Sequence, residues 1–228
     1  MSYLLGIIGL FVTLGLAFLI SSNKKAIKLK PLIVMFVLQL VLGFVLLRTT
    51  FGTAVVSVLA KMFDHLLAFA GQGVDFVFAG VANKGSAPFF LSVLMPIVFI
   101  SAIIGILRYI KILPLFMKAV GLGLSKINGM GKLESYNGVA SAILGQSEVF
   151  ISIKKELPFL SEKRLFTMSV SAMSTVSMSI VGSYMALIDS KYVITALVLN
   201  LFGGYILASI VNPYVLEEKE DELIIEEN

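Results

Sequence analysis

The sequence predicts an all-α, polytopic transmembrane helical protein with a re-entrant helical hairpin and a discontinuous helix. Hydrophobic residues make up 58% of the chain and charged residues only 14%, whereas soluble domains carry about 25% charged residues. Long charge-free runs separate clusters of basic residues. In addition, two apolar stretches at residues 135–144 and 148–157 meet at Gly145, and each has about half of the ~20 residues that a helix needs to cross a bilayer.

Five charge-free runs are long enough to be membrane-spanning helices, since the hydrocarbon core is ~30 Å thick. They are expected at residues 3–20, 31–47, 86–107, 165–188 and 192–216. The first two spans form region 1–50. The third belongs to region 51–130, and the last two belong to region 131–216 together with the hairpin.

Two further stretches, at residues 52–82 and 112–130, mix apolar residues at helical spacing with charged ones. This pattern favours amphipathic helices that lie in the membrane interface. His65 falls in the first of them, and no second ligand accompanies it at metal-binding spacing. Since the chain also has no cysteine, neither a metal nor another cofactor is expected.

The basic residues predict the orientation, because cytoplasmic loops carry an excess of Lys and Arg. Fourteen of the eighteen lie in the loop at 24–30, between 108 and 164, or at Lys219. The N-terminus is therefore expected outside the plasma membrane. The acidic stretch 217–228 is expected inside, as a solvated linker. Basic residues beside spans point to membrane lipid as a partner and give no indication of nucleic acid.

The hairpin tip, residues 145–148, is the candidate ligand site. Gly145 permits a tight reversal, and Gln146 and Glu148 combine donor and acceptor groups that match a nucleobase or an amide. Such backbone is tolerated at membrane depth only where it faces protein or water. The alternative is structural: Ser147 and Glu148 are also ordinary residues for the first turn of a helix.

The span at 165–188 contains six serines and two threonines, whose hydroxyls compete with helical hydrogen bonds and favour bending or unwinding. Small residues also permit close helix packing, which is the alternative interpretation. A hairpin followed by a breakable helix is typical of transporter sites at the bilayer midplane. The sequence contains no catalytic pair of a nucleophile and a general base and no ATP-binding motif, so an enzyme is not expected.

The stretch from Asn137 to Glu148, which ends in Gly-Gln-Ser-Glu, and the later Met-Ser-Thr-Val-Ser at 173–177 resemble the bacterial nucleoside permease branch of the concentrative nucleoside transporters. The resemblance implies one half of an inverted-repeat symporter that takes up nucleosides. It implies nucleobase contacts from Gly145, Gln146, Ser147, Glu148 and Ile180. It also implies a coupling-ion site at Ser141, Leu144, Thr175 and Val176.

Two departures from the family pattern modify this expectation. Ser141 stands where sodium-coupled members have asparagine, which favours H⁺ over Na⁺ as the coupling cation, with Glu148 as the proton carrier. Family members are also about twice as long, so the C-terminal half with its ribose-binding residues would be a missing partner. The family forms trimers, and a homo-oligomer is expected. The alternatives are a gate-type nucleoside-recognition membrane protein and a membrane scaffold subunit, neither of which transports.

Overall fold

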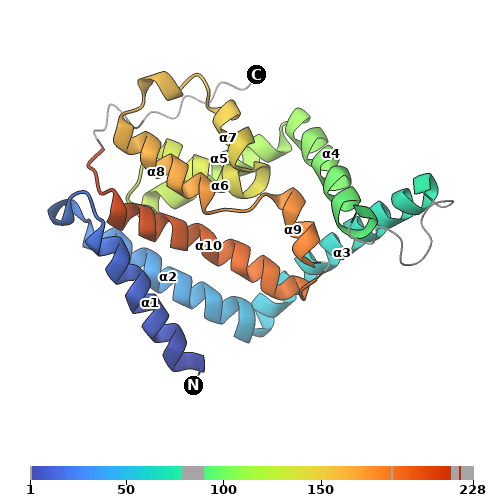
Figure 1. Ribbon diagram of the computed structural model, residues 1–228, viewed down its shortest axis with the longest axis horizontal. Coiled ribbons are helices and arrows are strands. Elements are labelled where there is room, and N and C mark those ends of the chain that lie inside the picture. The colour runs from blue at the N-terminus through green and yellow to red at the C-terminus, as the bar shows by residue number, and fades with distance from the viewer. Residues whose placement is uncertain (1, 79–89, 186, 217–220, 222–228) are drawn as a thin grey trace.

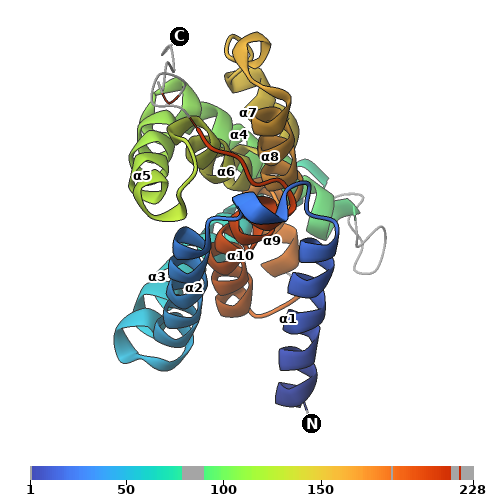
Figure 2. The same cartoon turned by 90° about the vertical axis from the view of Figure 1, so that its left-hand side faces the viewer.

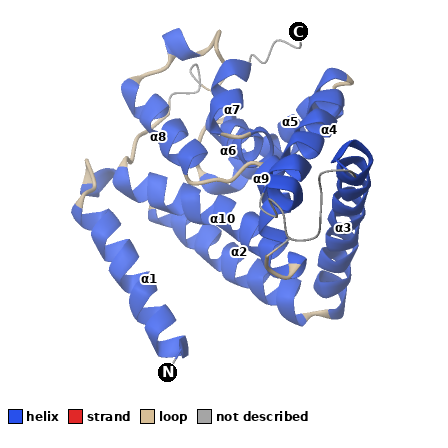
Figure 3. Cartoon of the chain, turned by 45° about the vertical axis from the view of Figure 1, so that its right-hand side comes forward, coloured by secondary structure: helices blue, strands red, loops and turns tan. Residues whose placement is uncertain are grey.

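The computed structural model describes residues 2–78, 90–185, 187–216 and 221, and within these residues it contains helices and no strands (Figures 1 and 3). The all-α prediction is confirmed. The helices are α1 (Ser2–Leu19), α2 (Leu29–Arg48), α3 (Thr50–Phe78), the π-helix η2 (Phe90–Leu94), α4 (Met95–Tyr109), α5 (Ile112–Asn128), α6 (Lys132–Leu144), α7 (Gln146–Ser152), α8 (Glu162–Met173), α9 (Met178–Met185) and α10 (Ser190–Val211). Two short 3-10 helices, η1 (Lys24–Ala26) and η3 (Leu157–Phe159), lie in loops.

The long helix α10 lies at the centre of the arrangement and contacts six of the other described helices: α1, α2, α3, α6, α8 and α9. Figure 1 shows α10 beside α2, with α5 to α8 on one side and α3 and α4 at one end. Figure 2 shows α1 and α2 extending away from the group that contains α5 to α8. The hairpin and the broken helix are therefore supported by the same central helix.

Much of the outer surface is apolar, as expected for helices that face lipid. Phe11 on α1 and Phe44 on α2 each expose about two thirds of their surface, at 69% and 65%. Soluble monomers rarely expose contiguous apolar surface on this scale. Exposed aliphatic and aromatic side chains continue along most of α1 and α2, which identifies a multi-pass membrane protein.

Within the described residues, four helical segments are long and apolar enough to cross a membrane: α2, α3, the pair α8 and α9 counted as one, and α10. The helices α4 and α5 meet this criterion only as a pair, and the pair is bent by 80°. The helix α1 is apolar but shorter. Since α3 also reaches spanning length, its expected position in the interface stays a prediction.

Some expected segments fall partly outside the described residues. These are positions 79–82 of the first amphipathic stretch, positions 86–89 of the third span and most of the acidic linker. The linker residue Asp221 is described, and it is not free in solvent. Its Oδ1 accepts a hydrogen bond of 2.6 Å from the backbone N–H of Lys132, so it caps the first turn of α6 from a distant part of the chain.

Candidate functional site

The chain reverses direction at Gly145, between α6 and α7, as the sequence predicts. Gly145 has φ of 111° and ψ of 165°, a conformation that residues with a side chain rarely adopt. A Cβ atom at this position would lie 2.9 Å from Glu148 Oε2 and 3.2 Å from Ser177 Cβ. Glycine is therefore required both by the backbone angles and by the close approach of Ser177, which lies in the break between α8 and α9.

The second arm of the hairpin differs from its expected extent of residues 148–157. The helix α7 begins two residues earlier, at Gln146, and ends at Ser152. Turns follow, and then η3, which contains Pro158. The expected arm continues through three consecutive charged residues, 154–156, and these lie in the turns. The helix α7 is therefore short, at roughly 10 Å for a rise of 1.5 Å per residue.

The serine-rich span is broken, which confirms the predicted discontinuous helix. The helix α8 ends at Met173 and α9 begins at Met178. Two hydroxyls bond back to carbonyls in the last turn of α8: Ser174 Oγ donates to Ser171 O and Thr175 Oγ1 donates to Ala172 O, both at 2.9 Å. This is the competition with the helical ladder that favours unwinding.

The first hairpin arm and α8 run side by side and contact each other at successive levels. Near their starts, Arg164 pairs with Glu134. In the middle, Asn137 Nδ2 donates to Met168 O at 2.9 Å. At the far end, Gly145 meets Ser177. The hairpin tip therefore lies directly against the break, although the two are separated by about thirty residues in the sequence.

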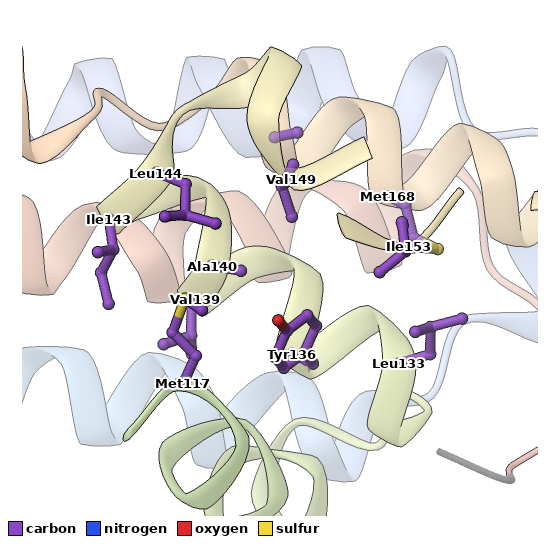
Figure 4. Close-up of a cluster of buried hydrophobic side chains, with 11 residues drawn as sticks. Met117, Leu133, Tyr136, Val139, Ala140, Ile143, Leu144, Val149, Ile153 and Met168 are labelled. Carbon is purple, nitrogen blue, oxygen red and sulfur yellow. The ribbon is translucent and has the colours of Figure 1, made fainter. Parts of the chain in front are cut away.

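An apolar cluster fixes the hairpin from below its tip (Figure 4). Tyr136 and Leu144 on α6, Val149 on α7 and Met168 on α8 are all buried in it, together with Met117 from α5. In a membrane protein, such packing is stabilised by van der Waals contacts between the helices. The tip backbone is thus held by side chains from four helices.

The candidate ligand-binding side chains differ in exposure. Gln146, Ser147 and Glu148 are exposed, and Ile180 on α9 is 42% exposed. Val149, the neighbour of Glu148 on α7, is buried in the apolar cluster, so that Glu148 points away from this cluster.

The candidate coupling-ion residues are less exposed than the tip. Ser141 and Leu144 are buried on α6, and Thr175 and Val176 are partly buried in the break. The Ser141 hydroxyl donates to Gly138 O at 2.9 Å. Leu144 is the last residue of α6, where carbonyl groups lack helical partners. The hydroxyl oxygens of Ser141 and Thr175 therefore lie on α6 and in the break, the two elements that meet at Gly145. Backbone carbonyl groups at the end of α6 and in the break add further oxygen atoms.

A buried ion pair at the base of the hairpin was not anticipated from the sequence. Glu134 is 1% exposed and Arg164 is 5% exposed, with Arg164 Nη2 donating to Glu134 Oε2 at 3.0 Å. The Tyr214 hydroxyl donates to Glu134 Oε1 at 2.9 Å, and burial, together with the charge of Glu134, raises the Tyr214 pKa. Arg164 thus has a structural partner in addition to its expected role in membrane orientation.

Two family models match the chain. One, described as "Na+ dependent nucleoside transporter N-terminus", matches residues 8–81. The other, described as "Nucleoside recognition", matches residues 90–191. The second match contains the hairpin, the break and all nine candidate site residues.

Curated relatives and a solved structure are similar along nearly the whole chain. The purine nucleoside transport protein NupG of Bacillus subtilis is 37% identical over 221 residues, which is 97% of this chain and 56% of the relative. The nucleoside permease NupC of Helicobacter pylori is 29% identical, over 93% of this chain and 53% of the relative. The structure of CNTnw in an inward-facing substrate-bound state is 27% identical with a TM-score of 0.85, over 95% of this chain and 55% of that one. The chain therefore spans about half the length of these relatives.

Proposed function

Because the chain belongs to the concentrative nucleoside transporter family, we propose that it carries the nucleobase-binding half of a protein that takes up nucleosides by cation symport. The observation that supports this most directly is the contact of Gly145 with Ser177. It joins the tip of a short hairpin to the break in a membrane-spanning helix. Transporters build substrate and ion sites from discontinuous helices of this kind.

In this proposal, Gln146 and Glu148 bind the nucleobase through hydrogen bonds, beside the backbone of Gly145 and the hydroxyl of Ser147. Their exposure in this chain leaves them open to a ligand. Gln146 provides both donors and an acceptor, and an ionised Glu148 accepts. Ile180 on α9 packs against the face of the base. The N–H groups in the first turn of α7 add further donors.

A coupling Na⁺ would bind between α6 and the break, at Ser141, Leu144, Thr175 and Val176. A hard cation such as Na⁺ requires several oxygen ligands at close range. Ser141 supplies a short hydroxyl that already donates to Gly138 O, so it reaches less far than a carboxamide would. We therefore favour H⁺ over Na⁺, with Glu148 as the proton carrier.

The N-terminus lies outside the plasma membrane in this proposal, and the hairpin base and Asp221 lie on the cytoplasmic side. This follows from the distribution of Lys and Arg residues. A second half of the transporter, which would contact the exposed tip and bind the ribose, is the expected partner, since the relatives are about twice as long. Assembly into trimers is expected from the family.

A second candidate function is nucleoside recognition without transport. The match of residues 90–191 to the model described as "Nucleoside recognition" supports it. The two functions share the same site and differ in whether the ligand crosses the membrane.

Uptake and binding of uridine test the proposal together. Cells without endogenous nucleoside uptake would express the chain, and radiolabelled uridine would be followed with and without an uncoupler. Binding to the purified chain would be measured by calorimetry. Saturable uptake that the uncoupler abolishes supports proton symport. Binding without uptake supports the nucleobase site, and uptake measured with the second half co-expressed then separates symport from recognition alone. If uridine and a purine nucleoside such as inosine both fail to bind, the nucleobase site is disproved.

A further inference from the structure

The break in the serine-rich helix leaves backbone groups without helical partners in a membrane-spanning segment. In lipid, unwound backbone must find partners inside the protein. The hydroxyls of Ser174 and Thr175 satisfy carbonyls in the last turn of α8. These bonds stay within the broken helix itself, so they do not determine where the break lies relative to the rest of the molecule.

Asn200 on α10 provides a contact from outside the broken helix. Its Nδ2 donates a hydrogen bond to the carbonyl oxygen of Ser174, the residue that caps the C-terminus of α8. Asn200 and Val176 also line one cavity of about 430 Å³ between α9 and α10, whose walls are otherwise mostly apolar. Asn200 is itself exposed on α10, so its hydrogen bond joins the break to α10 along the wall of this cavity.

A second contact one helical turn further along α10 acts on the same residue. A Cβ atom at Gly204 would lie 2.6 Å from Ser174 Oγ, so the absence of a side chain there lets Ser174 lie close against α10. Residues four apart share one face of a helix. Asn200 and Gly204 therefore hold Ser174 from one face of α10, by a hydrogen bond and by close packing.

We propose that Asn200 is a positioning residue that fixes the break against α10, and thereby fixes the following residues Thr175, Val176 and Ser177 next to the hairpin tip at Gly145. The inference rests on the proposed function only for the roles of Thr175 and Val176 in ion binding. The fixed geometry of the break is a separate consequence, and it is measurable without transport.

The chain contains no cysteine, so a single Ser177→Cys probe reports on the break. The full chain carrying this probe would be reconstituted in lipid, and its rate of alkylation by N-ethylmaleimide would be measured. Asn200→Leu keeps the size of the side chain and removes the donor. We expect labelling about two- to tenfold faster, the range that corresponds to losing one typical hydrogen bond. Asn200→Gln retains a donor, and we expect it to restore a slower rate.

Two controls separate this effect from general loosening. Gln39→Leu removes another amide-to-carbonyl bond to α10, from Gln39 Nε2 to Leu199 O at 3.1 Å, and should leave the Ser177→Cys rate unchanged. A Thr195→Cys probe, buried on α10, should also keep its rate in the Asn200→Leu chain. The proposal is overturned if Asn200→Leu leaves the Ser177→Cys rate unchanged, or if it accelerates both probes equally.

Uridine added to the same reaction tests the proposed function independently. Protection of Ser177→Cys by uridine in the chain with Asn200 intact supports a ligand at the tip. Absence of protection by uridine and inosine, combined with a faster rate in Asn200→Leu, contradicts the nucleoside site and leaves the positioning role of Asn200 supported.

Discussion

Replacing Arg164 by methionine should strongly destabilise the chain, because it would leave the Glu134 carboxylate buried without its charge partner. Glu134 is 1% exposed and receives hydrogen bonds from Arg164 and Tyr214. Removing one member of a buried pair typically costs about 3–5 kcal/mol. For a chain of this size, 1 kcal/mol corresponds to a shift of roughly 2–4 °C in Tm. We therefore expect Tm to fall by roughly 6–20 °C.

The loss of helical circular dichroism on heating in detergent would measure this shift, and matched variants determine its cause. Tyr214→Phe removes one hydrogen bond to Glu134 and should cost about 1 kcal/mol. A double variant, Glu134→Leu with Arg164→Met, replaces both charges by apolar groups and should be less destabilised than Arg164→Met alone. A Tm for Arg164→Met within 2 °C of that of the unmodified chain would refute the reasoning. So would a double variant whose loss of stability equals the sum of the losses in the two single variants, Glu134→Leu and Arg164→Met.

Three further predictions concern the site and its orientation. Gln146→Ala or Glu148→Gln should weaken nucleoside affinity about tenfold or more in calorimetry, since a lost partner in a desolvated hydrogen bond costs about 1–3 kcal/mol; unchanged affinity would contradict nucleobase binding at the tip. Uptake by the full-length form, with the second half present, should persist when choline replaces Na⁺ and rise as external pH falls, and Ser141→Asn should introduce Na⁺ dependence; uptake that vanishes in choline would instead identify Na⁺ as the coupling ion. Cysteine at Lys24 should react only with cytoplasmic reagent and cysteine at Lys191 only with external reagent, and labelling of Lys24→Cys from outside would reverse the topology.

Features that depend on local chemistry could be predicted from the sequence. The reversal at Gly145 and the break after Met173 both follow from residues at those positions: a glycine at φ of 111°, and hydroxyls that bond to carbonyls three residues earlier. The expected length of α7 is wrong, because the expected arm includes the charged residues 154–156, which lie in turns.

Features that depend on distant partners were missed for a physical reason. The pair Glu134 and Arg164 is separated by 30 residues, and Asn200 and Ser174 by 26. In the sequence, Arg164 resembles the other juxtamembrane cations, and Asn200 is one polar residue in an apolar span. An intramembrane polar residue is by default a functional hypothesis that needs a named partner, and only the folded chain identifies the partner.

The two proposed sites are too close to act independently. Leu144 and Val176, proposed at the ion site, directly precede Gly145 and Ser177, which contact each other at the tip. The backbone that would present carbonyl oxygens to the cation is therefore continuous with the backbone that orients Gln146. A Na⁺ ion bound by Leu144 and the break would therefore also move the first residue of α7, and a proton carried by Glu148 would act at the nucleobase site itself. Because linkage is reciprocal, nucleoside bound at Gln146 and Glu148 would in turn favour the arrangement that holds the cation, and symport requires this mutual dependence.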